Sequence, residues 1–153
     1  YTGSQSLIDG PKSKRRRGRA AAANIVPTST GAATAATEIL PALEGKLDGM
    51  AIRVPVPNGS VTELVVDLAD SPGVDGINGA FRAAADGELA GVLGYTDDEV
   101  VSSDIVGLPH SSYVDLNSTN VVRDGALAKV LTWYDNEFGF SNRMLDVARY
   151  VTA

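Results

Sequence analysis

Arg53 stands out because it places a charged side chain within an apolar stretch. Residues 49–56 read GMAIRVPV, and strand alternation places Arg53 on the face opposite Met50 and Ile52. An unpaired buried charge is costly, so the guanidinium needs an anionic partner. That partner is either an internal carboxylate, the commoner outcome in proteins, or an anionic ligand such as phosphate, which a planar five-donor group fits well.

A second anion-seeking feature is the segment Thr28-Ser29-Thr30-Gly31, which precedes the alanine-rich run AATAATEIL. Hydroxyl residues in this position predict a helix start, with Pro41 ending the helix. The free N–H groups of a helix N-terminus attract phosphate, and a glycine lets a ligand approach closely. Ordinary helix capping explains the same residues.

The run KSKRRRGR at residues 12–19 holds 6 of the 13 basic residues of the chain and no acidic one. A solvated loop is the simplest interpretation. Nucleic-acid binding is a second, but the run lacks aromatic residues for base stacking, and the rest of the chain carries 7 basic against 19 acidic residues. In the third interpretation, one arginine points inward to the same anion as Arg53.

The segment WYDNEFGFSN, residues 133–142, places the polar residues Asp135, Asn136 and Glu137 between aromatic residues at a strand-to-helix junction. A core cluster with a helix cap by Asp135 or Asn136 explains the pattern. An amide between aromatic rings is also suited to bind the carboxamide of a flat ligand.

Cysteine is absent and His110 is the single histidine. The chain therefore holds no thiolate nucleophile, disulfide or multi-histidine metal site, and we expect no metal. His110 lies in GLPHSS, which predicts a loop histidine and not a catalytic base.

The composition is that of a globular domain: 153 residues, 44% hydrophobic and 21% charged, with a net charge of −6. No apolar run approaches the length that a membrane-spanning helix needs. The chain begins with Tyr1 and shows no signal-peptide pattern, so we expect a trimmed start or a fragment.

Periodicity predicts the elements that position these residues. Residues 1–19 form a long loop, residues 73–86 an amphipathic helix, and the segment EFGFSNRMLDVARYV the final helix. Residues 49–56 and 60–68 predict two adjacent antiparallel strands joined by a turn at Pro57-Asn58-Gly59. Further strands are expected at 91–95, 100–105, 111–116 and 126–134. The strands come in runs without βα alternation, which predicts an α+β fold, a largely antiparallel mixed sheet with helices on one face.

These segments occur together, in order and spacing, in one family. The chain resembles the C-terminal catalytic domain of glyceraldehyde-3-phosphate dehydrogenase over nearly its whole length, most specifically in PTSTGAA, AIRVP and WYDNEFGFSN. Residues 1–23 resemble the family's S-loop, which lies at the centre of a homotetramer and borders the cofactor of a neighbouring subunit. The match is loose over residues 105–125.

The resemblance implies two phosphate-binding positions. Thr2, Arg17 and Arg53 match residues that hold the C3 phosphate of glyceraldehyde 3-phosphate. Thr30 and Gly31, again with Arg53, match the site of the attacking inorganic phosphate.

The resemblance also implies a cofactor contact. Asn136 matches the residue that hydrogen-bonds the nicotinamide carboxamide, and Phe140 stands where the family usually has a tyrosine beside the nicotinamide. Gly10-Pro11 resembles the form found in NAD-preferring members, which favours NAD and leaves NADP open.

The nucleophilic cysteine of the family and the histidine that activates it lie upstream of the position matched by Tyr1. We therefore expect residues 1–153 to be the catalytic domain without its first strand and without the N-terminal NAD-binding domain. The implied enzyme is cytoplasmic and oxidises an aldehyde to an acyl phosphate with NAD and inorganic phosphate. The 153 residues alone are expected to be inactive.

Two alternatives remain open. Erythrose-4-phosphate dehydrogenase is a sister activity that shares most of these motifs. A noncatalytic binding or assembly module is the alternative from another class.

Overall fold

The computed structural model describes residues 1–153, which form two compact units, Tyr1–Pro57 and Asn58–Ala153. The division falls within the segment expected to be the turn of a hairpin. Each unit has its own sheet, and each is described separately below.

The first unit begins with the long loop expected from the sequence. Residues 1–25 are irregular apart from two 3₁₀ helices, Arg15–Gly18 and Ala21–Ala23. Strands β1 (Val26–Ser29) and β2 (Met50–Arg53) then form an antiparallel pair. Between them lie α1 (Ala32–Ile39), which confirms the predicted helix, and a 3₁₀ turn at Pro41–Leu43.

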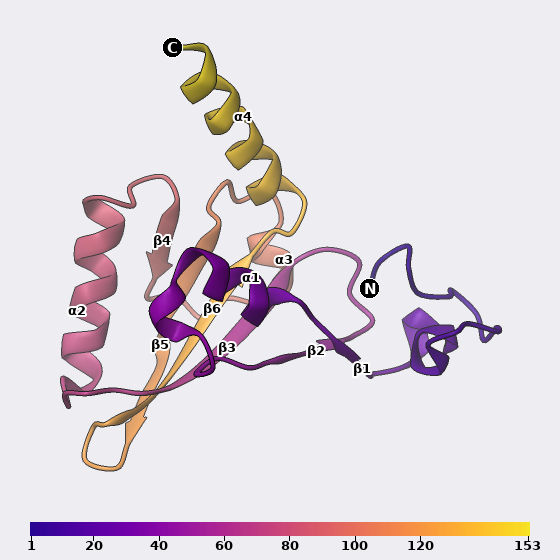
Figure 1. Ribbon diagram of the computed structural model, residues 1–153, viewed down its shortest axis with the longest axis horizontal. Coiled ribbons are helices and arrows are strands. Elements are labelled where there is room, and N and C mark those ends of the chain that lie inside the picture. Colours follow the sequence, from indigo (N-terminus) through magenta and orange to yellow (C-terminus); the bar gives the residue numbers. More distant parts are fainter. The chain divides into compact units, whose positions relative to one another are not determined.

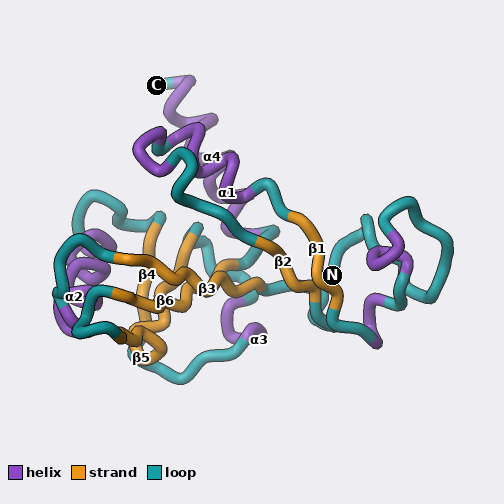
Figure 2. Tube along the Cα trace, turned by 60° about the horizontal axis from the view of Figure 1, so that its bottom comes forward, coloured by secondary structure: helices purple, strands orange, loops and turns teal.

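The second unit is built on a four-stranded sheet in the order β3-β6-β5-β4 (Figures 1 and 2). The β3–β6 and β6–β5 pairs are antiparallel, and the β5–β4 pair is parallel. The sheet is thus mixed and largely antiparallel, which confirms the predicted fold class. The strands are β3 (Ser60–Asp67), β4 (Leu93–Thr96), β5 (Ser112–Val122) and β6 (Leu127–Tyr134).

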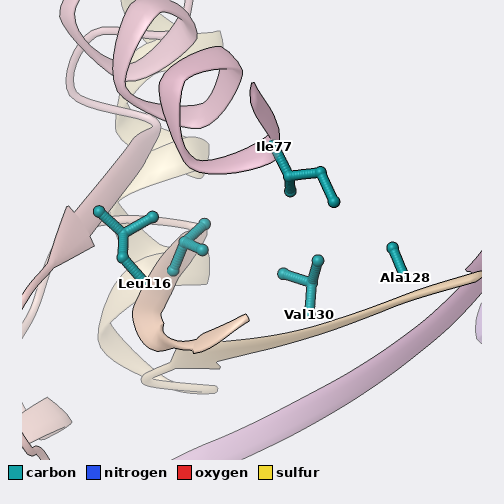
Figure 3. Close-up of a cluster of buried hydrophobic side chains, with 5 residues drawn as sticks. Ile77, Leu116, Ala128 and Val130 are labelled. Carbon is teal, nitrogen blue, oxygen red and sulfur yellow. The ribbon is translucent and has the colours of Figure 1, made fainter. Parts of the chain in front are cut away.

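Helix α2 (Gly73–Asp86) covers part of one sheet face, against β4 and β5. Its Ile77, Phe81 and Ala85 are spaced four residues apart and therefore lie on one helix face. Figure 3 shows the resulting core, in which Ile77 faces buried side chains of β5 and β6. The buried members are Ile77, Val114, Leu116, Ala128 and Val130.

Helix α4 (Phe138–Thr152) confirms the predicted final helix but does not lie along the sheet. Its one buried residue is Gly139 in the first turn, and Figures 1 and 2 show the helix leading away from the end of β6. Helix α3 (Ser102–Ile105) is a single turn. None of the helices has the length and apolarity that crossing a bilayer requires.

Two sequence predictions were wrong. Residues 49–56 and 60–68 do not pair with each other, because β2 pairs with β1 and β3 pairs with β6. Residues 100–105 contain α3 and no strand. The carboxylate of Asp104 accepts the N–H of Val101 at 2.8 Å, which caps this turn and turns the chain away from an extended conformation.

Candidate functional site

Strands β1 and β2 bring Arg53 and Thr28 to one side of the two-stranded sheet. The register pairs Val26 with Arg53 and Thr28 with Ala51. Directly paired residues share a face, and so do residues two apart in a strand. Arg53 and Thr28 therefore lie on the same face, opposite Met50 and Ile52, which the sequence also placed across from Arg53.

The guanidinium of Arg53 is held by hydroxyls. Its Nη1 donates to Thr2 Oγ1 at 2.9 Å and to Ser4 Oγ at 3.0 Å. The two hydroxyl oxygens are themselves 3.1 Å apart and share a hydrogen bond. None of the ion pairs involves Arg53, so the internal salt bridge allowed by the sequence is not formed.

Arg17 reaches the same neighbourhood from the long loop. Its Nε donates to the Oγ1 of Thr28, a residue of β1, at 3.0 Å. Burial lowers the pKa of the Arg53 guanidinium, and the positive charge of Arg17 lowers it further. Two guanidinium groups thus lie close together with no carboxylate between them, and an anion would relieve their repulsion.

The basic run of the loop does not act as one uniform patch. Arg17 is turned inward, while Arg19 forms an exposed pair with Asp9 at 3.2 Å. A shallow pocket of about 490 Å³ is lined by residues 14–17 together with Pro27, Thr28, Ser29 and Met50. Of the three interpretations of the run, the inward-pointing arginine is the one that this geometry favours.

Thr30 and Gly31 lie just beyond β1, at the start of α1. Thr30 Oγ1 accepts the N–H of Ala32 at 3.2 Å, so the capping function expected from the sequence is present. Gly31 is exposed, and a side chain built there would meet no atom within 4 Å. The backbone at this helix start is therefore open to a ligand, although no hydrogen bond connects Thr30 or Gly31 to Arg53.

In the second unit, Asp135 organises the junction between β6 and α4. The residue is 2% exposed, and its carboxylate accepts four hydrogen bonds. The donors are the N–H groups of Gly107 (2.7 Å), Glu137 (2.8 Å) and Phe138 (2.8 Å) and the amide Nδ2 of Asn58 (3.1 Å). Of the two capping residues proposed from the sequence, Asp135 is the one that caps α4.

The ionisation of Asp135 follows from these contacts. Burial alone would raise the pKa of its carboxyl group, but the backbone N–H donors and Asn58 favour the charged form more strongly. The pKa of Asp135 therefore lies below its ordinary value.

Asn136 is half-buried, and both ends of its amide have partners. Ser60 Oγ donates to Asn136 Oδ1 at 3.2 Å, and Asn136 Nδ2 donates to Glu137 Oε1 at 3.3 Å. Phe140 follows four residues later and is 67% exposed. The structure thus places an oriented amide one helical turn from an open aromatic ring.

His110 lies in the loop before β5, as the sequence predicts. Its ring is 5.5 Å from that of Tyr113, and burial, with a smaller effect of Arg143, lowers the pKa of its imidazole. No cluster of three or more acidic or histidine side chains gathers into a metal site.

Sequence reasoning missed Ser4 and Ser60, two hydroxyl residues that hold Arg53 and Asn136, and it named Thr28 without its partner Arg17. A serine two residues from Thr2 was a local signal for Ser4. Ser60 had no such signal, because 76 residues separate it from Asn136.

Comparison with known proteins gives close relatives over the whole chain. The chain is 70% identical over 152 residues to the glyceraldehyde-3-phosphate dehydrogenase of Haloarcula vallismortis, covering 99% of this chain and 45% of that protein. It is 58% identical over 151 residues to the enzyme of that name from Mycobacterium tuberculosis strain H37Rv, and 54% identical to that of Mycobacterium leprae, with 99% and 44% covered in each case.

The chain thus spans somewhat less than half the length of these curated relatives. The family model described as "Glyceraldehyde 3-phosphate dehydrogenase, C-terminal domain" matches residues 1–136. The chain belongs to the glyceraldehyde-3-phosphate dehydrogenase family, in the region of its C-terminal domain.

Proposed function

We propose that this chain supplies the phosphate-binding residues and a nicotinamide contact of a phosphorylating glyceraldehyde-3-phosphate dehydrogenase. The observation that carries the proposal is the pair Arg53 and Arg17, two neighbouring guanidinium groups with hydroxyl partners and no carboxylate. Such a pair is costly in the absence of an anion and well suited to a phosphate group.

The hydroxyls around Arg53 can serve an anion as well. A hydroxyl accepts up to two hydrogen bonds and donates one. Thr2 and Ser4 both accept from Arg53 Nη1 and are bonded to each other, so at least one hydroxyl hydrogen remains to be donated onward. We assign Thr2, Arg17 and Arg53 to the phosphate of the aldehyde substrate.

Thr30 and Gly31 are assigned to the attacking inorganic phosphate, together with Arg53. Support comes from the exposed Gly31 and from the start of α1, where backbone N–H groups favour an anion.

The residues at the β6–α4 junction fit a nicotinamide cofactor. One lone pair of Asn136 Oδ1 and one hydrogen of its Nδ2 are uncommitted, which matches the donor and acceptor of a carboxamide. The exposed ring of Phe140 offers an apolar surface to a flat heterocycle. When bound, NAD or NADP would accept a hydride from the substrate.

The role of this chain is binding and orientation. It contains no cysteine, so residues 1–153 cannot form the thioester through which the family oxidises its aldehyde. The proposal therefore includes that this 153-residue polypeptide alone is inactive. The intact enzyme would work as a cytoplasmic homotetramer.

The test is Arg53→Leu in the intact enzyme that contains this chain. We expect the kcat/KM for glyceraldehyde 3-phosphate to fall by about 10- to 100-fold, because a charge-assisted contact is lost. With unphosphorylated glyceraldehyde, the rate of NADH formation in the first turnover, which precedes the attack by inorganic phosphate, should change by less than about threefold, since that substrate carries no phosphate to bind.

Arg19→Leu is the matched control, because Arg19 lies in the same loop and pairs with Asp9 at an exposed site. Arg19→Leu should leave the activity toward both substrates unchanged. An equal loss of the first-turnover rate for both substrates in Arg53→Leu would contradict the assignment of Arg53 to the substrate phosphate and indicate a role in folding.

A further inference from the structure

We propose that Ser60 is a positioning residue that fixes which end of the Asn136 amide faces the cofactor. The inference rests on the proposed nicotinamide contact and extends it to a residue on another strand. Its basis is the hydrogen bond from Ser60 Oγ to Asn136 Oδ1 at 3.2 Å, which joins the start of β3 to the start of α4.

The backbone around Ser60 and Asn136 is well anchored. Ser60 pairs with Tyr134 at the end of the β3–β6 ladder. Asn58, two residues before Ser60, donates to the buried carboxylate of Asp135 at 3.1 Å, directly before Asn136. The segment that carries Ser60 therefore holds Asp135 and Asn136 from the same side.

A tight turn keeps Ser60 in place. Gly59 has a φ of +88°, and a side chain there would come within 2.7 Å of the carbonyl oxygen of Ser102. The turn accordingly requires glycine, and Ser60 enters the strand at one fixed position.

The partners of the amide decide its orientation. A carboxylate only accepts hydrogen bonds, so Glu137 Oε1 must face the NH₂ group of Asn136. The amide oxygen then faces Ser60, whose hydroxyl donates to it. Ser60 and Glu137 together select one of two orientations of the amide, which otherwise differ little in shape.

The functional consequence is a fixed acceptor. Asn136 Oδ1 keeps one lone pair for the N–H of a ligand carboxamide. Without the Ser60 hydroxyl, the amide depends on the exposed Glu137 alone and can turn to present N–H groups instead. An analogue that offers only a carbonyl would then bind better relative to NAD.

The experiment compares NAD with 3-acetylpyridine adenine dinucleotide, which has a carbonyl but no amide N–H. The dissociation constants of both are measured for the intact enzyme by equilibrium titration, without turnover. In Ser60→Ala, we expect the preference for NAD over the analogue to fall by about three- to tenfold, the effect of one hydrogen bond. Ser60→Thr keeps the hydroxyl and should restore the preference.

Ser112→Ala is the matched control, because Ser112 is another strand serine in this sheet whose hydroxyl bonds a side chain, that of Thr132. It should leave the preference unchanged. The side-chain ¹⁵N–H₂ signals of Asn136 in the cofactor-free protein give a second readout, and they should shift and broaden in Ser60→Ala but not in Ser112→Ala.

The variant Asn136→Ala distinguishes a failure of the proposed role of Ser60 from a failure of the proposed cofactor contact of Asn136. If it lowers the affinity for NAD while Ser60→Ala leaves both the preference and the amide signals unchanged, the role of Ser60 is wrong and the cofactor contact stands. If Asn136→Ala leaves the affinity for NAD unchanged, the cofactor contact itself is wrong.

Discussion

At the scale of single residues, the buried carboxylate of Asp135 should contribute most to the stability of the candidate cofactor site. Asp135→Asn replaces an oxygen with an NH₂ group, which faces N–H donors. We expect the free energy of unfolding to fall by about 2 kcal/mol, because at least one buried donor loses its acceptor. Urea unfolding followed by the fluorescence of Trp133, the single tryptophan, measures the loss.

Two comparisons test this prediction. Asp97→Asn removes an exposed partner of Arg82 and should cost under about 1 kcal/mol. The pKa of Asp135 is lowered in the native protein, so its charged form stabilises the fold above the unfolded pKa of about 4. This contribution is lost as the pH falls through the lower native value. A penalty for Asp135→Asn that stayed constant down to that pH would argue against a charged Asp135.

At the scale of elements, the first turn of α4 is fixed by its close approach to the loop before β5. A Cβ on Gly139 would lie 2.7 Å from the backbone oxygen of His110. Gly139→Ala should therefore lower the thermal unfolding midpoint, although alanine favours helices by up to about 1 kcal/mol over glycine.

Gly79 in α2 is the matched control, since a Cβ there meets nothing within 4 Å. Gly79→Ala should raise the unfolding midpoint, because it reduces the entropy of the unfolded chain without a clash. A rise of the midpoint in both variants would show that helix propensity, and not the contact with His110, governs α4.

At the scale of the whole molecule, charge repulsion should limit stability at low salt. The net charge is −6, and outside residues 12–19 the balance is 7 basic against 19 acidic residues. Raising KCl from about 10 mM to about 150 mM shortens the screening length from roughly 30 Å to roughly 8 Å. We expect the thermal midpoint to rise over this range. Screening by salt weakens the repulsion among the excess acidic residues more than it weakens the attraction within the exposed ion pairs.

Scanning calorimetry or circular dichroism at constant pH follows this change, with sucrose of equal osmolality as an uncharged control. A midpoint that falls as KCl is added would mean that surface ion pairs outweigh the net repulsion.

The elements whose signals are local could be predicted from the sequence alone. The amphipathic pattern of residues 73–86 predicted α2, the apolar run ALAKVLTWY predicted β6, and the glycine- and proline-rich start predicted a long loop. The family was also recognisable from sequence, because motifs such as AIRVP and WYDNEFGFSN are contiguous. Hydrophobic periodicity and turn residues act over a few neighbouring positions, so they can be recognised in a single sequence.

The pairing of strands and the contacts between distant side chains followed from the three-dimensional fold and not from local sequence. The turn at Asn58 and Gly59 looked like that of a hairpin, yet β2 pairs with β1 and β3 with the distant β6. The short α3 was mistaken for a strand because four residues are too few to show a period.

The candidate sites depend on the same long-range arrangement. Arg53 meets Thr2 and Ser4 across about 50 residues, and Asn136 meets Ser60 across 76. Such contacts are set by burial and by the completion of hydrogen bonds throughout the fold, which no local pattern specifies. The sequence therefore identified the arginine and the amide, and the tertiary structure supplied the hydroxyls that orient them.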